Sequence, residues 1–66
     1  MTIYINNEAL QVSDNLNIKD LLAHCNIATI GTAVAVDNKV ISRSQWDNYY
    51  LNEGNKVTII RAVCGG

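Results

Sequence analysis

The chain closes with KVTIIRAVCGG, residues 56–66, in which a strand-like run is followed within a few residues by two glycines. Glycine makes up about 7% of ordinary sequence, so two closing glycines are roughly a 0.5% coincidence. Because glycine lacks a β-carbon, such a pair can pass in extended form through a channel too narrow for side chains. We therefore interpret Gly66 as a carboxylate presented to the chemistry of another protein, and Gly65 as the residue that lets it thread. The alternative is a frayed chain end that is merely tolerated.

Size and charge exclude several classes of function. We expect 66 residues to form a single domain spanning 1–66, with a flexible tail at about 62–66. A chain this short buries only about 60% of its unfolded surface, which leaves little room to line an enzyme pocket. The net charge of −1 is scattered and offers no basic face for nucleic acid. There is no long apolar run and no secretion signal, so we expect a cytoplasmic monomer that does not bind a membrane.

The few sulfur and imidazole groups do not indicate a metal site. We interpret Cys25 and Cys64 as reduced thiols, since small disulfide-bonded domains usually contain more cysteines. With the single His24 they fall short of the four ligands that structural zinc requires. His24 is expected to be solvated at the end of a helix, and Cys25 to be a thiol packed in the core.

The first third of the chain predicts a hairpin followed by a helix. Apolar residues alternate through residues 1–12 around a turn at 6–8, which is typical of two strands with one apolar face. The period then changes to that of an amphipathic helix, whose buried face would be formed by Ile18, Leu21, Leu22 and Cys25. Asn17 is the predicted N-cap, and Asp20 is expected to exchange hydrogen bonds with it as in a capping box. Asn26 is the predicted stop of the helix.

The rest of the chain predicts a second hairpin, a short helical turn and a final strand. Residues 32–36 and 39–41 are strand-like and are separated by a two-residue turn at 37–38. Ser44 is the predicted cap of a helical turn that carries Gln45 and Trp46, with Trp46 as a packing anchor. Leu51 is expected to return to the core before residues 53–55 reverse the chain.

The final strand is expected to present two different faces. Val57 and Ile59 share one face, which we assign to the core, and this order of elements predicts an α+β fold with one sheet on one helix. Ile60 then points to solvent beside Thr58 and Ala62, and these three residues are a candidate docking patch. The alternative is that Ile60 is an isolated exposed apolar residue, which is common.

This pattern resembles the β-grasp fold of ubiquitin and its bacterial sulfur-carrier relatives over the full length of the chain. Within that group, residues 33–41 (AVAVDNKVI), 43–46 (RSQW), 51–57 (LNEGNKV) and 61–66 (RAVCGG) resemble the ThiS family of thiamine-biosynthesis sulfur carriers. The small subunit of molybdopterin synthase tends to have a Phe-Pro-Pro segment before its diglycine, and this chain has neither Phe nor Pro. The resemblance implies a mixed sheet packed on one main helix plus a short helical turn.

The chain departs from the family pattern at four positions. The family tends to have Pro at Ser42, Asn at Asp37 and Asp at Asn55, which are turn-compatible exchanges. It also tends to have a small residue at Cys64. We interpret Cys64 as a tolerated small side chain in the threading tail. The alternative is attack of its thiol on the activated terminus, although an ordinary thiol is mostly protonated at neutral pH.

The resemblance implies the role of a protein cosubstrate and not of an enzyme. Gly66 would be adenylated by an adenylating enzyme of the ThiF type, which resembles the ubiquitin-activating enzymes and supplies the ATP and Mg²⁺. A persulfide protein would then donate sulfur to give a thiocarboxylate, which a thiazole synthase of the ThiG type would consume. The carrier itself would bind no cofactor.

Three other functions stay open at this point. One is a sulfur carrier for another pathway, of the molybdopterin type. Another is a ubiquitin-like modifier, in which activated Gly66 is joined to lysine side chains. The third is a non-covalent binding module that uses the sheet face around Ile60, and removal of Gly66 would leave such a module active.

Overall fold

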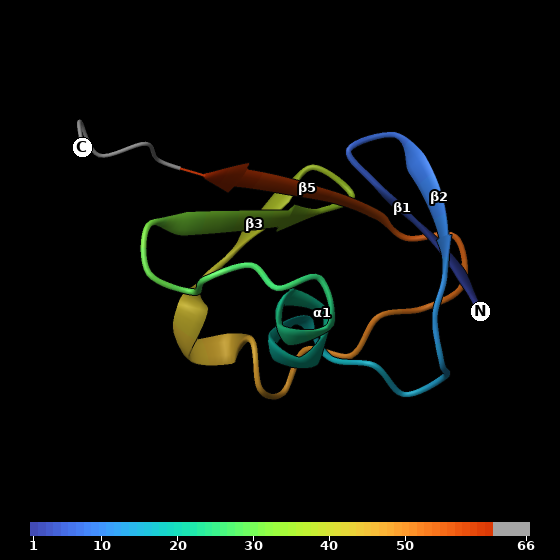
Figure 1. Cartoon of the computed structure of the whole chain (residues 1–66), viewed down its shortest axis with the longest axis horizontal. Coiled ribbons are helices and arrows are strands. Elements are labelled where there is room, and N and C mark those ends of the chain that lie inside the picture. The colour runs from blue at the N-terminus through green and yellow to red at the C-terminus, as the bar shows by residue number, and fades with distance from the viewer. Residues whose placement is uncertain (62–66) are drawn as a thin grey trace.

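A computed structural model describes residues 1–61, in which a five-stranded sheet packs with one face on helix α1 (Figure 1). In chain order the elements are β1 (Thr2–Ile5), β2 (Glu8–Gln11), α1 (Ile18–His24), β3 (Thr32–Val36), β4 (Lys39–Ile41), the 3₁₀ helix η1 (Arg43–Gln45) and β5 (Lys56–Arg61). The strand order is β2-β1-β5-β3-β4, with β1 and β5 parallel and the other neighbours antiparallel. The α+β class with a mixed sheet is therefore confirmed.

Both hairpins turn through two residues with left-handed backbone. Asn6 and Asn7 have φ of 49° and 73°, and Asp37 and Asn38 have φ of 50° and 71°. Asn and Asp are the residues other than glycine that adopt this region most readily, and two such residues in succession match the twist of paired strands. Both predicted hairpins are confirmed. The first turn is shorter than predicted, because Glu8 already pairs with Ile5 as the first residue of β2.

Helix α1 begins directly after the predicted N-cap and ends at His24, one residue before Cys25, which was predicted to lie on its buried face and is its C-cap. The backbone N–H of Asp20 donates to Oδ1 of Asn17 at 2.7 Å, which confirms Asn17 as the N-cap. Nδ2 of Asn17 donates to the Asp47 carbonyl at 3.1 Å, and so ties the helix to the segment before β5. The helix ends at His24, and Asn26 leaves it with φ of 57°.

The short helical turn begins earlier than predicted. Its cap position is Ser42 and not Ser44, which lies inside η1. The turn closes through bonds three residues apart, from the Gln45 N–H to the Ser42 carbonyl at 2.9 Å and from the Trp46 N–H to the Arg43 carbonyl at 3.1 Å. The side chain of Ser42 makes no capping hydrogen bond, so the sequence signal for a side-chain cap was misleading here.

The core between sheet and helix is apolar and follows the predicted alternation. Trp46 is buried, and its indole Nε1–H donates to the Ile41 carbonyl at 3.0 Å, which confirms its role as a packing anchor. Val57 and Ile59 point into the core from β5, whereas Thr58 and Ile60 point to solvent, as predicted. The buried residues are Ile3, Ile18, Leu21, Leu22, Val34, Val36, Ile41, Trp46, Leu51, Val57 and Ile59.

The start of β5 is fixed by side chain to backbone hydrogen bonds. Asp37 accepts from the Lys56 N–H at 3.0 Å and from Nδ2 of Asn55 at 2.8 Å, while its own N–H donates to the Lys56 carbonyl at 2.8 Å. Gly54, with φ of 83°, donates its N–H to the Thr2 carbonyl at 2.7 Å. These bonds bring β5 into the sheet between β1 and β3 and set the direction in which it runs.

Candidate functional site

β5 leads to the predicted covalent site, Gly66, and its last residue is also the last residue that the structure describes. β5 ends at Arg61, which is exposed and lies opposite Thr32 of β3. The N-terminus and the end of β5 lie at opposite ends of the molecule (Figure 1). The predicted tail residues Cys64, Gly65 and Gly66, and the predicted partner contact Ala62, lie outside the described residues.

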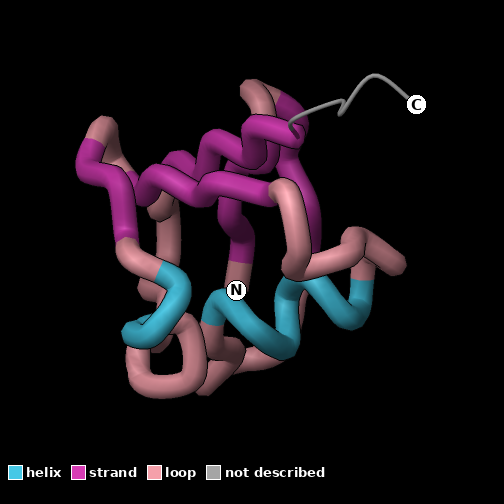
Figure 2. Tube along the Cα trace, turned by 90° about the vertical axis from the view of Figure 1, so that its left-hand side faces the viewer, coloured by secondary structure: helices cyan, strands magenta, loops and turns pink. Residues whose placement is uncertain are grey.

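The face of the sheet turned away from α1 carries an exposed apolar strip. Figure 2 shows the strands as one layer above the helices, so the far face of that layer has no helix over it. Ile60 is 58% exposed and lies directly opposite Ala33, and Val40 is 77% exposed and lies opposite Ala35. Ala35 also lies opposite Thr58, so the five residues form a continuous uncharged surface across three neighbouring strands. We call this surface the outer strip: Ala33, Ala35, Val40, Thr58 and Ile60.

The outer strip extends the predicted docking patch to strands that sequence reasoning had not included. Ile60 and Thr58 were predicted to share this face, whereas Ala33 and Val40 were missed. The alternation of alanine and valine in residues 32–36, where the valines are buried, could have assigned the alanines to the outer face, whereas their place beside Ile60, and that of Val40, follow only from the strand register. Because the positions between buried valines must face the other side, the alanines form a flat surface beside Ile60.

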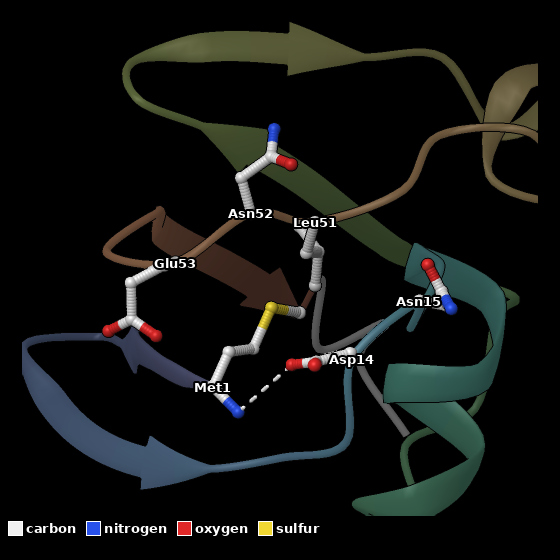
Figure 3. Close-up of a pocket in the computed structure, with 6 residues that line it drawn as sticks. All are labelled: Met1, Asp14, Asn15, Leu51, Asn52 and Glu53. Atoms are coloured by element: carbon white, nitrogen blue, oxygen red, sulfur yellow. Dashed lines mark ion pairs between the residues drawn. The ribbon is translucent and has the colours of Figure 1, made fainter.

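A cavity of about 300 Å³ lies at the N-terminal end of the molecule (Figure 3). It is lined by Met1, Asp14, Asn15, Leu51, Asn52 and Glu53. The α-amino group of Met1 donates to the Val12 carbonyl at 2.6 Å and forms an ion pair with Asp14 at 3.4 Å. Asp14 is largely exposed, and the lining lacks a nucleophile paired with a base, so these contacts hold the start of β1.

The titratable side chains of the described part of the chain are dispersed. Within residues 1–61, no three His, Cys, Asp or Glu side chains come together in a way that could hold a metal ion. His24 is exposed in the last turn of α1, and Cys25 is a half-buried free thiol packed against the core, both as predicted. In the same part of the chain, no helix has the length and apolar character needed to cross a membrane.

Solved structures share this fold over the whole chain. The crystal structure of the thiamine biosynthesis protein ThiS from Geobacter metallireducens matches with a TM-score of 0.86 and covers 100% of both chains at 23% identity. A solution NMR structure of a thiamine biosynthesis protein from the same organism matches with a TM-score of 0.83, also at 23% identity, and covers 100% of this chain and 88% of that one. These likenesses confirm the expected ubiquitin-like β-grasp fold.

The sequence comparisons agree with the structural ones. The chain is 24% identical over 66 residues to the sulfur carrier protein ThiS of Escherichia coli (strain K12), and the alignment covers 100% of each protein. The model of the ThiS family matches residues 2–66, and so includes both the outer strip and the terminal glycines. A match over nearly the whole chain decides the family. This chain belongs to the ThiS family.

Proposed function

We propose that this chain is a sulfur carrier of thiamine biosynthesis whose terminal Gly66 is converted to a thiocarboxylate. The observation that carries the proposal is the placement of the diglycine: it follows a strand whose last described residue, Arg61, is exposed at the end of the sheet. Membership of the ThiS family supports the same role, since a curated relative is named as a sulfur carrier. The protein would act as a cosubstrate in the cytoplasm, and its partners would perform the chemistry.

The proposed chemistry begins with activation of a poor electrophile. A carboxylate resists nucleophilic attack because it is negatively charged and its oxygen is a poor leaving group. Gly66 therefore attacks the α-phosphorus of ATP, which releases pyrophosphate and leaves an acyl-adenylate. The terminal sulfur of a protein persulfide displaces AMP, and a thiol then reduces the acyl–sulfur–sulfur bond to leave the thiocarboxylate. The ThiF-type enzyme binds the ATP and Mg²⁺, and the ThiG-type synthase takes up the sulfur.

The carrier must also dock, because an extended tail alone binds poorly. Each residue that becomes ordered in a channel loses about 1–2 kcal/mol of conformational entropy. The rigid domain must supply contacts that offset this loss, and the outer strip is an exposed apolar surface that reaches the end of β5. We propose that it contacts the adenylating enzyme, with Ile60 as the main apolar contact.

The proposal predicts a specific change in mass. Incubation of the protein with ATP, Mg²⁺, a ThiF-type enzyme and a persulfide donor should raise the intact mass by one exchange of oxygen for sulfur. Fragmentation should place the exchange at Gly66. A variant that ends at Gly65 is the matched control and should keep its mass.

Three results would contradict the proposal. An unchanged wild-type mass, with the enzyme shown to be active on another carrier, would rule out thiocarboxylate formation. Recovery of the protein joined to lysine side chains would favour a ubiquitin-like modifier. A variant without Gly66 that keeps every partner interaction would favour a non-covalent module.

Substitution of Ile60 by Asp should weaken binding to the adenylating enzyme by about tenfold or more. Full burial of an isoleucine side chain contributes roughly 1.5–3 kcal/mol of free energy. Ile60 is 58% exposed in the free protein, so docking would supply about half of that amount. An aspartate at the same position adds the cost of burying an unpaired charge. The measurement is the dissociation constant by titration calorimetry, with an amide NMR spectrum to show that the variant is folded.

Ile30→Asp is the matched control for this substitution. Ile30 is 83% exposed and lies in the loop between α1 and β3, two residues before Thr32, which pairs with Arg61. The substitution therefore introduces the same charge near the end of β5 but outside the sheet. We expect it to bind with nearly wild-type affinity. Equal losses in the two variants would mean that added negative charge, and not the outer strip, weakens binding.

A further inference from the structure

The parallel pairing of β1 with β5 stops well before β5 ends. The register joins Tyr4 to Lys56 and Ile5 to Val57, after which the chain turns away from β5 into the β1–β2 hairpin. β5 continues to Arg61. Among the described residues, its edge on the β1 side therefore has no strand beside it beyond Val57.

The side chain of Asn6 forms hydrogen bonds to this edge of β5 at the point where the pairing with β1 ends. The Asn6 N–H donates to the Val57 carbonyl at 2.9 Å, which completes the backbone pairing. The side chain then bonds the next backbone groups on the same edge: its Oδ1 accepts from the Ile59 N–H at 3.0 Å, and its Nδ2 donates to the Ile59 carbonyl at 3.5 Å. An amide group has the same donor and acceptor as a peptide unit, so Asn6 extends the ladder by one position without a strand. Figure 1 shows the β1–β2 turn standing beside β5.

We propose that Asn6 is a positioning residue for the carrier reaction, a role that rests on the proposed function. Strand residues two apart direct their backbone groups to the same edge, so Arg61 is the next residue after Ile59 on the edge that Asn6 holds. Without Asn6, the pairs Ile60–Ala33 and Arg61–Thr32 with β3 are the strand contacts that remain, within residues 1–61, for the last residues of β5. Asn6 fixes the direction in which the strand delivers the terminal residues to the adenylating enzyme.

The contribution of Asn6 should appear in KM and not in kcat. A strand end that frays in the free protein must be ordered again when the partner binds, which weakens binding without touching the reacting carboxylate. Loss of one net hydrogen bond corresponds to a change of about three- to tenfold. We therefore expect Asn6→Gly to raise the KM for the carrier in adenylation by about three- to tenfold at unchanged kcat.

Asn7→Gly is a closely matched control for this variant. Asn6 and Asn7 are adjacent, and both have positive φ, which glycine accepts without strain. Of these two residues, only Asn6 forms side-chain hydrogen bonds to β5 in the described part of the chain. Asn7→Gly should keep the wild-type KM. Asn6→Asp keeps the acceptor for the Ile59 N–H and tolerates the backbone conformation, so it should recover part of the loss.

The experiment combines kinetics with amide hydrogen exchange of the full chain. Steady-state adenylation with a ThiF-type enzyme gives KM and kcat for the wild type and the three variants. In Asn6→Gly, exchange should accelerate at Ile59, whose N–H bonds Asn6, and at Ile60, whose backbone pairs with Ala33, while the core amides of Ile3 and Val34 keep their protection. A merely structural role would instead accelerate exchange across the whole sheet, and that result would overturn the proposal.

The kinetic outcomes separate this proposal from the proposed function. Equal KM values for Asn6→Gly and Asn7→Gly, with an active wild type, overturn the positioning role alone. A wild type that is not adenylated by an enzyme shown to be active overturns both. A fall in kcat at unchanged KM also contradicts the role of Asn6, because it would place the effect after binding.

Discussion

Gly65→Val should reduce adenylation of the carrier by about 100-fold or more and leave the thermal midpoint of unfolding nearly unchanged. A tail that threads a narrow channel has no room for a branched side chain, and a misplacement of about 1 Å at a reacting group can lower a rate by about 100-fold. Gly65 follows Arg61 by four positions, and the buried residues of the described core lie between Ile3 and Ile59. The measurements are pyrophosphate exchange catalysed by a ThiF-type enzyme and thermal unfolding by circular dichroism.

Gly65→Ala provides a graded comparison, since it adds a single methyl group at the same position. We expect it to fall between the wild type and the valine variant. Adenylation of Gly65→Val at the wild-type rate would show that the tail is not confined in the partner. A drop of several degrees in the thermal midpoint would show instead that Gly65 belongs to the fold, and the threading role would then be wrong.

Trp46→Ala should remove most of the stability of the domain. Replacement of a buried tryptophan by alanine costs about 3–5 kcal/mol in other proteins. A domain of 66 residues is expected to have a total stability of only roughly 3–10 kcal/mol. Trp46 is 2% exposed and its indole N–H bonds the Ile41 carbonyl, so the variant loses packing and a buried hydrogen bond together. The free energy of unfolding by urea, followed by far-ultraviolet circular dichroism, measures the loss.

Trp46→Phe separates the two contributions. Phenylalanine keeps much of the aromatic packing and loses the N–H donor, so we expect it to cost about 1–3 kcal/mol. A loss below about 1 kcal/mol in Trp46→Ala would show that η1 is not anchored through this side chain. Equal losses in the two variants would assign the effect to the hydrogen bond.

Local features of the fold could be predicted because neighbouring residues encode them. The Asp37–Asn38 turn, the Asn17 cap and the stop at Asn26 each depend on backbone preferences within a few positions, and all three are confirmed. The inward and outward faces of β5 follow from the period of two. The start of η1 was misjudged because a 3₁₀ turn can close through backbone bonds alone, so Ser44 was a poor guide.

The contacts that shape the candidate site could not be predicted, because they join residues far apart in sequence. Asn6 and Ile59 are separated by 53 positions, and Asp37 and Lys56 by 19. Such pairs follow only from the order of strands in the sheet, which periodicity does not reveal. For the same reason Ile60 was found from its own strand, whereas Ala33 and Val40 required the register of β3 and β4. The roles of Gly65 and Gly66 stay predictions.

The central place of β5 has a consequence for synthesis of the protein in the cell. β5 lies between β1 and β3 and so joins the two hairpins into one sheet, and it is the last of the described strands to be synthesised. Two-stranded hairpins are marginal on their own, so a nascent or prematurely ended chain without β5 has no stable sheet and is open to proteolysis. Acquisition of the fold therefore acts as a length check. A carrier that has folded has been translated at least through Arg61, five residues before the carboxylate that its partner needs.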